Sequence, residues 1–301
     1  MARGNDSEQR TVALIGAGRV ARGLGARLRE AGWKIGAVTA RRMGAARSAV
    51  RAIGGGTACV GIGRRVLNAE VLLLAVPDDA LAGVAAQIER VCGDELARRI
   101  VVHTSGALSA DALEAVARRG AWTGVMHPMQ TFGARTRPRL EGVLFGIEGH
   151  PEALRLIRQM VRSLGGEAAR VKPGRKAQYH CAGTFAAAHV LAAVEAAVQL
   201  AVDAGLQRRQ ATRALLRLAK QVLDNRDLLG PHAAWTGPLS RGDFATIRLH
   251  WQALGGMPEE LREAYAAMSR LAARLLMESP EAALERLAQI TSRAATARSG
   301  Q

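Results

Sequence analysis

One short polar segment carries side chains suited to proton transfer. Lys176 and His180 are four positions apart, so on a helix they project from one face, one turn from each other. A lysine that is partly desolvated beside other cations has a lowered pKa and can serve as a general acid or base. Hydride reduction of a carbonyl or imine needs such a proton donor, which makes Lys176 the candidate catalytic group and His180 its companion. The alternative is a solvated lysine near a domain junction.

A second polar segment offers groups that could orient a substrate. His127, Gln130 and Thr131 place an imidazole, an amide and a hydroxyl just after a predicted strand. At the carboxyl end of a strand, such groups could bind a small polar molecule. A structured loop with a surface histidine explains the same pattern equally well, so the sequence leaves both interpretations open.

A polar interruption between predicted helices supplies two more candidate substrate contacts. Asn225 precedes it, and Arg241 and Asp243 lie within it. A guanidinium can bind a substrate carboxylate through two N–H donors, so Arg241 is a candidate ligand. The alternative is a plain ion pair between Arg241 and Asp243.

A glycine-rich turn near the N-terminus predicts a dinucleotide site. Residues 16–21 read Gly-Ala-Gly-Arg-Val-Ala, directly after a predicted strand and at the start of a predicted helix. Gly16 permits the tight turn, Gly18 lets the backbone approach a pyrophosphate, and Ala21 lets the helix pack on the strand. The helix N-terminus presents N–H groups and a positive dipole end to the phosphates. The expected contacts are Gly16, Ala17, Gly18, Arg19 and Val20.

The end of the second predicted strand distinguishes NADP from NAD. NAD enzymes place an acid there for the ribose 2′-hydroxyl, whereas NADP enzymes need a cation and no acid. Here Thr39 is followed by Arg41 and Arg42, and residues 31–69 contain no acidic side chain. Either arginine can bind a 2′-phosphate through two N–H donors, with the Thr39 hydroxyl as a further contact. The sequence therefore predicts NADP(H), the alternative being two solvated arginines in an Arg-rich chain.

Two further loops follow predicted strands at the sheet edge where ligands of open α/β folds bind. The continuous apolar run 71–76 predicts a strand buried on both faces, and the next predicted strand is 100–103. Asp78 and Asp79, just after the first of these strands, are expected to be helix caps rather than catalytic acids. The residues expected to line the nicotinamide half of the site are Ala75, Val76, Pro77, Ser105 and Gly106.

The order of predicted elements indicates two domains. Apolar runs alternate with amphipathic stretches in the first half, which is typical of a mostly parallel sheet. After residue 171 the pattern is helical, rich in Ala and Leu, with no convincing strand. We therefore expect an α/β Rossmann-type domain of residues 1–171 followed by an all-helical domain of residues 172–301. Strands are predicted at 12–15, 35–39, 71–76, 100–103, 122–126, 143–147 and 167–171, and the first helix at 17–31.

Composition argues against several other classes of protein. The net charge of +16 over 301 residues comes mainly from scattered arginines, and aromatic residues make up only 3%, too few for a base-stacking surface. Nucleic-acid binding is therefore the weaker hypothesis. The apolar segment 185–202 contains polar residues and many alanines, which favours a helix buried in a bundle over a membrane span. The polar residues 1–10 predict a frayed terminus instead of a signal peptide, so we expect a cytoplasmic protein.

The three cysteines give no sign of a metal site or a disulfide. Cys59, Cys92 and Cys181 are far apart in the sequence and form neither a CxxC pair nor a cluster with histidines. We expect all three to be small core residues in a reducing compartment, and no metal.

Six motifs in fixed order resemble one group of bacterial proteins. The motifs are GAGRVA, AVPDDAL, HTSGAL, HPMQTF, KAQYHCAG and TGPLSRGD, and the resemblance as a whole covers residues 11–265. The group has a Rossmann-like domain followed by a C-terminal domain of unknown function. It is similar to the superfamily with the 6-phosphogluconate dehydrogenase type of C-terminal domain, which includes pyrroline-5-carboxylate reductase, ketopantoate reductase and prephenate dehydrogenase.

The resemblance implies an interdomain cleft and a helical domain that forms a homodimer. In the related β-hydroxyacid dehydrogenases an active-site lysine begins a helix, and Lys176 matches it, while His180 stands where that family has asparagine. His127 resembles the histidine of prephenate dehydrogenase that meets the substrate hydroxyl. The leading hypothesis is an NADP(H)-dependent oxidoreductase acting on a small polar carbonyl, imine, hydroxy or amino compound. The alternative is a non-catalytic NADP(H) sensor or scaffold.

Overall fold

A computed structural model describes residues 10–133 and 137–292, so the expected frayed terminus lies almost wholly outside the described residues. The contacts divide the chain into two units, Met1–Ala187 and Ala188–Gln301. This division by contacts lies after the boundary predicted at residue 171. Helix α6 (Lys176–Thr184) belongs to the first unit, because side chains from its first turn bond to the sheet and its loops. A helical composition alone does not reveal which unit a helix packs on.

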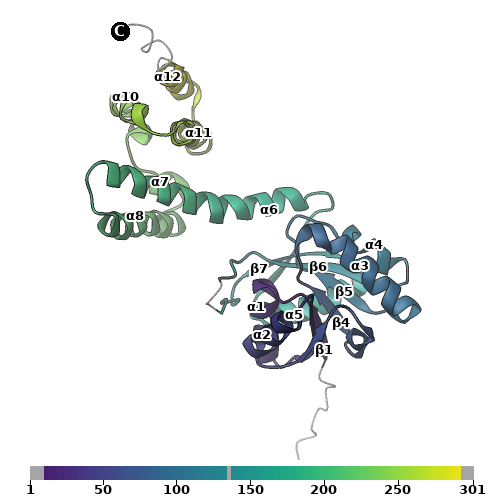
Figure 1. Ribbon diagram of the computed structural model, residues 1–301. Helices are drawn as coiled ribbons and strands as arrows, with labels where there is room; N and C mark the ends of the chain where they lie inside the picture. The colour runs from purple at the N-terminus through teal and green to yellow at the C-terminus, as the bar shows by residue number, and fades with distance from the viewer. Residues whose placement is uncertain (1–9, 134–136, 293–301) are drawn as a thin grey trace, which may run out of the picture. The chain divides into compact units, whose positions relative to one another are not determined.

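The first unit is built on one eight-stranded sheet, which confirms the predicted Rossmann-type fold (Figure 1). The strand order is β3-β2-β1-β4-β5-β6-β7-β8, and all neighbours are parallel except β6 and β7. The strands are β1 (Thr11–Ile15), β2 (Lys34–Ala40), β3 (Thr57–Val60), β4 (Val71–Leu74), β5 (Ile100–His103), β6 (Trp122–Pro128), β7 (Leu144–Gly149) and β8 (Glu167–Arg170).

Helices cover both faces of this sheet, and β1 shows why. Along β1, Val12 and Leu14 pack into one apolar cluster, and Ala13 and Ile15 pack into another. Because successive side chains of a strand point to opposite faces, the strand needs a helical layer on each side. The first cluster includes α1 (Arg19–Glu30), α2 (Met43–Ile53) and α5 (Pro151–Ser163), and the second includes α3 (Asp78–Cys92) and α4 (Glu114–Ala117).

The second unit is helical throughout its described residues. Its core is small and centres on Ile247, Ala273 and Leu287. A π-helical turn, Phe185–His189, precedes it and contains the division between the units. The helices are α7 (Val190–Asp203), α8 (Arg208–Leu229), α9 (Pro231–Ala234), α10 (Phe244–Ala253), α11 (Glu259–Leu276) and α12 (Glu281–Ser292).

One helix within the described residues is long and apolar enough to cross a membrane by length and composition. It runs from Lys176 to Asp203, with a mean hydropathy of 1.7 over its most apolar window. Only 6% of that window is buried within the chain, so the expectation of a helix buried in a bundle does not hold for a single copy. One such helix is weak support for a membrane span, because helices of soluble proteins pass the same test.

Candidate active site

The glycine-rich turn is fixed by the ends of three strands. Gly16 has a φ of +116°, and its N–H donates to the carbonyl of Thr39 at 3.0 Å. A Cβ atom at Gly16 would lie 2.3 Å from the carbonyl oxygen of Ala75. Both the left-handed backbone and the close approach therefore require glycine at this position.

The second glycine of the turn faces open space. Gly18 is the N-cap of α1, and a Cβ atom there would meet nothing within 4 Å. The protein itself therefore does not require glycine at 18, whereas a ligand resting on the backbone would. No side chain caps α1 and its first turn holds no acid, so its N–H groups are available to an anion. These observations fit the pyrophosphate of a dinucleotide.

A cavity of about 450 Å³ lies beside this turn. Arg19 and Arg22 from α1 line it, together with Phe132 and Arg137 from the β6–β7 connection. Arg22 also donates from Nε to the carbonyl of Ala17 at 2.9 Å, which holds its guanidinium at the start of the helix. The cavity is therefore positively charged, as a phosphate-binding region requires.

The end of β2 is suited to a second anion. Thr39 is buried, whereas Arg41 and Arg42 are exposed and have no ion-pair partner among the described residues. Arg42 is also the N-cap of α2, whose first turn contains no acid. Two free guanidinium groups and a helix N-terminus therefore meet at the position predicted for the 2′-phosphate. The helix α2 was not predicted, and it strengthens this assignment.

The loop after β4 differs from its predicted role. Pro77, not an aspartate, is the N-cap of α3, and no side chain caps the helix. Asp78 and Asp79 lie in the first turn, so the capping prediction is wrong in detail. The carboxylate of Asp78 instead accepts a hydrogen bond from the Ser105 hydroxyl at 3.0 Å, which ties the β4 and β5 loops together.

The loop after β5 is organised by a buried histidine. His103 is fully buried, its Nδ1 accepts the N–H of Ser105 at 3.1 Å, and its Nε2 lies 2.9 Å from the carbonyl of Ser109. Nε2 therefore carries the proton of a neutral ring. Burial lowers the pKa of His103 to about 4, which keeps the ring neutral at ordinary pH. His103 thus holds the loop in shape.

Lys176 is the charged group at this edge of the sheet. It is only 3% exposed, and its Nζ donates to the carbonyl of Ser105 at 3.1 Å. Burial lowers the pKa of Lys176 to about 8, although the carboxylates of Glu148 and Asp78 act in the opposite direction. At neutral pH the ammonium holds a proton that it releases far more readily than a solvated lysine does.

Three rings from β6 and α6 meet beside this lysine. The Nδ1 of His127 lies 3.0 Å from the Tyr179 hydroxyl, and the rings of His127 and His180 are 5.8 Å apart at 81°. Burial, together with the charges of Lys176 and the other histidines, lowers the pKa of His127 to about 4. Burial also raises the pKa of Tyr179. Both groups are therefore neutral hydrogen-bonding partners at pH 7.

Gly106 lies directly against these rings. A Cβ atom there would lie 2.4 Å from Cδ2 of His180 and 2.8 Å from Nε2 of His127. Ser105, the residue before it, carries the carbonyl bound by Lys176. The structure therefore brings together Lys176, His180, His127, Ser105 and Gly106, which the sequence had placed in three separate segments.

The remaining predicted substrate residues have no hydrogen bond to Lys176, His127 or His180 among the described residues. Gln130 and Thr131 are exposed in the loop after β6, where Gln130 bonds to the carbonyl of Arg139. Asn225 and Arg241 belong to the second unit, and Asn225 accepts a hydrogen bond from Gln221. The role of these four residues in binding a substrate stays a prediction.

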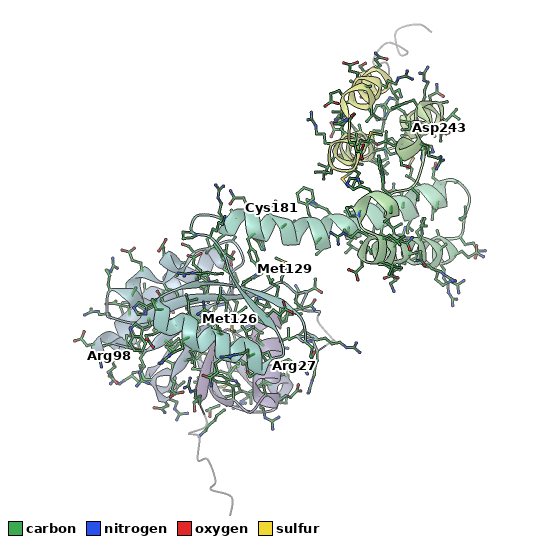
Figure 2. All side chains as sticks on the ribbon, turned by 180° about the vertical axis from the view of Figure 1, so that it is seen from behind. Arg27, Arg98, Met126, Met129, Cys181 and Asp243 are labelled. Carbon is green, nitrogen blue, oxygen red and sulfur yellow. The ribbon has the colours of Figure 1, made fainter. Side chains whose placement is uncertain are left out.

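The cysteines follow the prediction only in part. Cys92 is buried and Cys59 is half-buried, but Cys181 is exposed on α6 (Figure 2). The expectation that all three are core residues is therefore wrong for Cys181, since α6 packs only one face against the sheet. Among the described residues no group of histidine, cysteine or acidic side chains could hold a metal ion.

Sequence reasoning missed three residues of this site. His103 and Glu148 lie inside strands, and Tyr179 lies between the two candidates on α6. One oxygen of Glu148 is buried without a hydrogen-bond partner, while the other accepts the N–H of Ala110. A histidine or glutamate inside an apolar strand is a usable signal of a functional site, because burying such a group costs free energy unless it is paired or hydrogen-bonded.

Each half of the chain matches the model of a known protein family. Residues 3–128 match the model of the Rossmann-like domain, and residues 143–272 match a model described as a domain of unknown function, DUF2520. These matches confirm the resemblance predicted from the six motifs. No curated protein matches the chain.

Solved structures share the fold at low sequence identity. A protein from Bacteroides fragilis assigned as an NADP oxidoreductase is 22% identical with a TM-score of 0.72, covering 88% of this chain and 98% of that one. Pyrroline-5-carboxylate reductase from Coxiella burnetii is 16% identical with a TM-score of 0.59, and the match covers 96% of this chain and 98% of that one. A reductive aminase from Aspergillus terreus, in complex with NADPH and ethyl-5-oxohexanoate, is 15% identical with a TM-score of 0.65. That match covers 88% of this chain and 94% of the aminase.

Proposed function

We propose that this chain, a Rossmann-like protein with a DUF2520 C-terminal domain, is an NADP(H)-dependent oxidoreductase that reduces a carbonyl or imine of a small polar molecule. The buried lysine carries the proposal. Lys176 is held at the carboxyl edge of the sheet, and a proton donor with a pKa near the working pH is what such a reduction needs. The names of the three structural neighbours described above are those of oxidoreductases, which points to the same class of reaction.

The chain takes NADP(H) as its cofactor. Gly16, Gly18 and the N-terminus of α1 would hold the pyrophosphate, and Arg41 and Arg42 the 2′-phosphate. The loops after β4 and β5, with Ala75, Val76, Pro77, Ser105 and Gly106, would line the nicotinamide. When bound, the cofactor supplies or accepts a hydride.

The side chains of the site divide the remaining work. Lys176 holds a proton at Nζ, fixed by the Ser105 carbonyl, and would release it to the oxygen or nitrogen of the reduced group. His127 and His180 would position that group, since their rings meet edge to face beside Gly106. Asp78 holds the Ser105 loop in place through the serine hydroxyl.

A titration with NADPH and with NADH, followed by nicotinamide fluorescence, tests the cofactor assignment. We expect NADPH to bind at least tenfold more tightly, because a bidentate contact to the 2′-phosphate adds about 1.5 kcal/mol or more. The variant Arg41→Ser should remove most of that preference and leave NADH affinity unchanged. Arg51→Ser, at the other end of α2, is the matched control and should behave as the unmodified protein does.

Two outcomes would contradict the proposal. A preference for NADH would refute the 2′-phosphate assignment, and binding of neither cofactor would refute the dinucleotide site. Tight NADPH binding without consumption of the cofactor, tested with a broad set of keto acids, ketones and imines, would favour the sensor or scaffold instead.

The second unit is proposed to form a homodimer with a second copy of the chain. Large apolar side chains such as Leu191, Leu218 and Leu223 are more than half exposed. A groove of about 710 Å³ between α7 and α11 is lined by five alanines, Leu261 and Met268, together with polar side chains that include Glu195 and Arg208. Exposed apolar surface of this extent is typical of a subunit interface. A cytoplasmic location is proposed with it, consistent with three unpaired cysteines.

A further inference from the structure

Tyr179 lies within the candidate active site, yet it takes no part in the proton transfer proposed above. Its hydroxyl is held from two sides, by the backbone N–H of Gly146 at 3.1 Å and by the imidazole of His127 at 3.0 Å. Its ring packs so closely on Gly146 that a Cβ atom there would lie 2.5 Å from the ring. Tyr179 is therefore placed by the sheet and not only by its own helix.

The direction in which the hydroxyl proton of Tyr179 points decides which ring nitrogen of His127 carries a proton. The N–H of Gly146 donates to the hydroxyl oxygen, so the O–H proton of Tyr179 is free to point at an acceptor. Two acceptors are near, the Nδ1 of His127 at 3.0 Å and the carbonyl oxygen of His127 at 3.3 Å. The contact to Nδ1 is the shorter of the two, so we place the proton on the line to Nδ1.

A nitrogen that accepts a hydrogen bond in this way carries no proton of its own. The ring of His127 is neutral at pH 7, because it is largely buried and faces the cation of Lys176 and the rings of His180 and His103. Its one proton must then be on Nε2. That atom faces Gly106, where a Cβ atom would come within 2.8 Å.

We infer that Tyr179 is a positioning residue that fixes His127 as the Nε2–H tautomer and presents this N–H as a neutral hydrogen-bond donor at the site. Such a donor stabilises negative charge that develops on a carbonyl oxygen or imine nitrogen without giving up its proton. His127 then orients and polarises the group, while Lys176 supplies the proton. The use of the donor in catalysis rests on the proposed function, whereas the tautomer itself does not.

Long-range ¹H–¹⁵N NMR of the histidine rings in the full chain tests the inference without any substrate. His127 should show the pattern of a neutral ring with a protonated Nε2 and a bare Nδ1. Tyr179→Phe removes the donor, so both tautomers of His127 should become populated. Gly146→Ala forces the ring of Tyr179 away from His127, so it should also populate both tautomers of His127 while keeping the tyrosine.

The chain contains a matched control. Its only other tyrosine, Tyr265, also bonds to the Nδ1 of a histidine, His250 at 2.9 Å, with the rings at 85°. Tyr265→Phe should change the signals of His250 and leave those of His127 as they are. The retained NADPH affinity of each variant shows that the first unit is folded.

Two results would overturn the inference. One is a proton on Nδ1 of His127 in the unmodified protein, and the other is an unchanged tautomer in both Tyr179→Phe and Gly146→Ala. Once a substrate is known, Tyr179→Phe should lower kcat at least tenfold with little change in KM, because the donor acts mainly in the transition state. Absence of any turnover would refute the proposed reaction and leave the NMR result standing.

Discussion

The two units of the chain bury their apolar side chains to very different degrees. Of the seventeen large hydrophobic residues exposed among the described residues, four precede Ala188 and thirteen follow it. The first unit also holds three groups whose pKa is lowered strongly, His103, His127 and Lys176. In the described part of the second unit the pKa of Asp243 is lowered and that of Tyr265 is raised.

This difference separates two roles. A sheet covered on both faces gives a rigid, dry environment, and burial in such an environment can shift a pKa by several units. Helices with long exposed apolar faces are not complete as single copies and are suited to association. We therefore propose that the first unit carries the chemistry and the second unit carries the assembly, and the following changes test each part of this proposal.

The largest effect is expected from Lys176→Met. Loss of the proton donor should lower turnover about 10²- to 10⁴-fold. The same change should raise the free energy of unfolding at pH 7 by about 1–3 kcal/mol, because it removes a buried charge whose pKa is depressed. Steady-state kinetics and urea unfolding measure the two effects. Lys172→Met, which changes an exposed lysine near the same helix, should alter neither.

Two results for Lys176→Met would refute the assignment of Lys176 as the proton donor. If Lys176→Met keeps its turnover, the lysine is not the donor. If it is active and also less stable, the side chain serves only to brace the Ser105 loop.

Acid should destabilise the first unit more than the second. In the folded protein His103 and His127 have a pKa of about 4, whereas unfolded histidine has one of about 6.5, so the unfolded chain binds more protons between these values. The free energy of unfolding should therefore fall as the pH drops from 6.5 to 4, by up to about 3 kcal/mol for each histidine.

Urea unfolding at pH 7 and pH 4.5 measures this dependence, with near-UV circular dichroism as the probe. His103→Gln should be less stable at pH 7 but show a smaller pH dependence. His232→Gln, an exposed histidine of the second unit, should leave the dependence unchanged. A pH dependence that survives the loss of His103 and His127 together would show that other groups cause it.

A smaller effect is expected from an exposed leucine of α8. Leu218→Glu places a charge on an apolar face that is 61% exposed in the single chain, and it should weaken the dimer at least tenfold. Sedimentation or light scattering across a range of concentrations measures the change. Val60→Glu, an equally exposed apolar residue of the first unit, should leave the oligomeric state unchanged. An unmodified chain that is monomeric at all concentrations would refute the proposed interface.

The sequence was most informative where burial leaves a continuous pattern. Strands such as β4, covered on both faces, are unbroken apolar runs in the sequence, and the glycines of the turn after β1 predict that turn. The edge strand β3 was missed because its four residues are half-exposed or exposed, so they carry neither an apolar run nor a clear alternation. The other edge strand, β8, is as exposed as β3 and yet was predicted, so exposure at an edge makes a strand harder to predict without hiding every edge strand.

The site was predictable only one segment at a time. The spacing of Lys176 and His180 placed them on one face of a helix, and both do reach the Ser105–Gly106 loop. The partnership of Tyr179 with His127, residues 52 positions apart, depends on how α6 packs against β6 and β7. No local pattern encodes that packing, so the tyrosine looked like an ordinary helix residue.

The close packing of Tyr179 on Gly146 constrains how this protein can evolve. An aromatic ring at 179 is compatible only with a hydrogen atom in place of a side chain at 146. A side chain at 146 forces the ring at 179 to move, whereas a smaller residue at 179 leaves the glycine undisturbed, so the constraint acts in one direction. We therefore expect glycine at this position of β7 in any related chain that keeps a ring at 179.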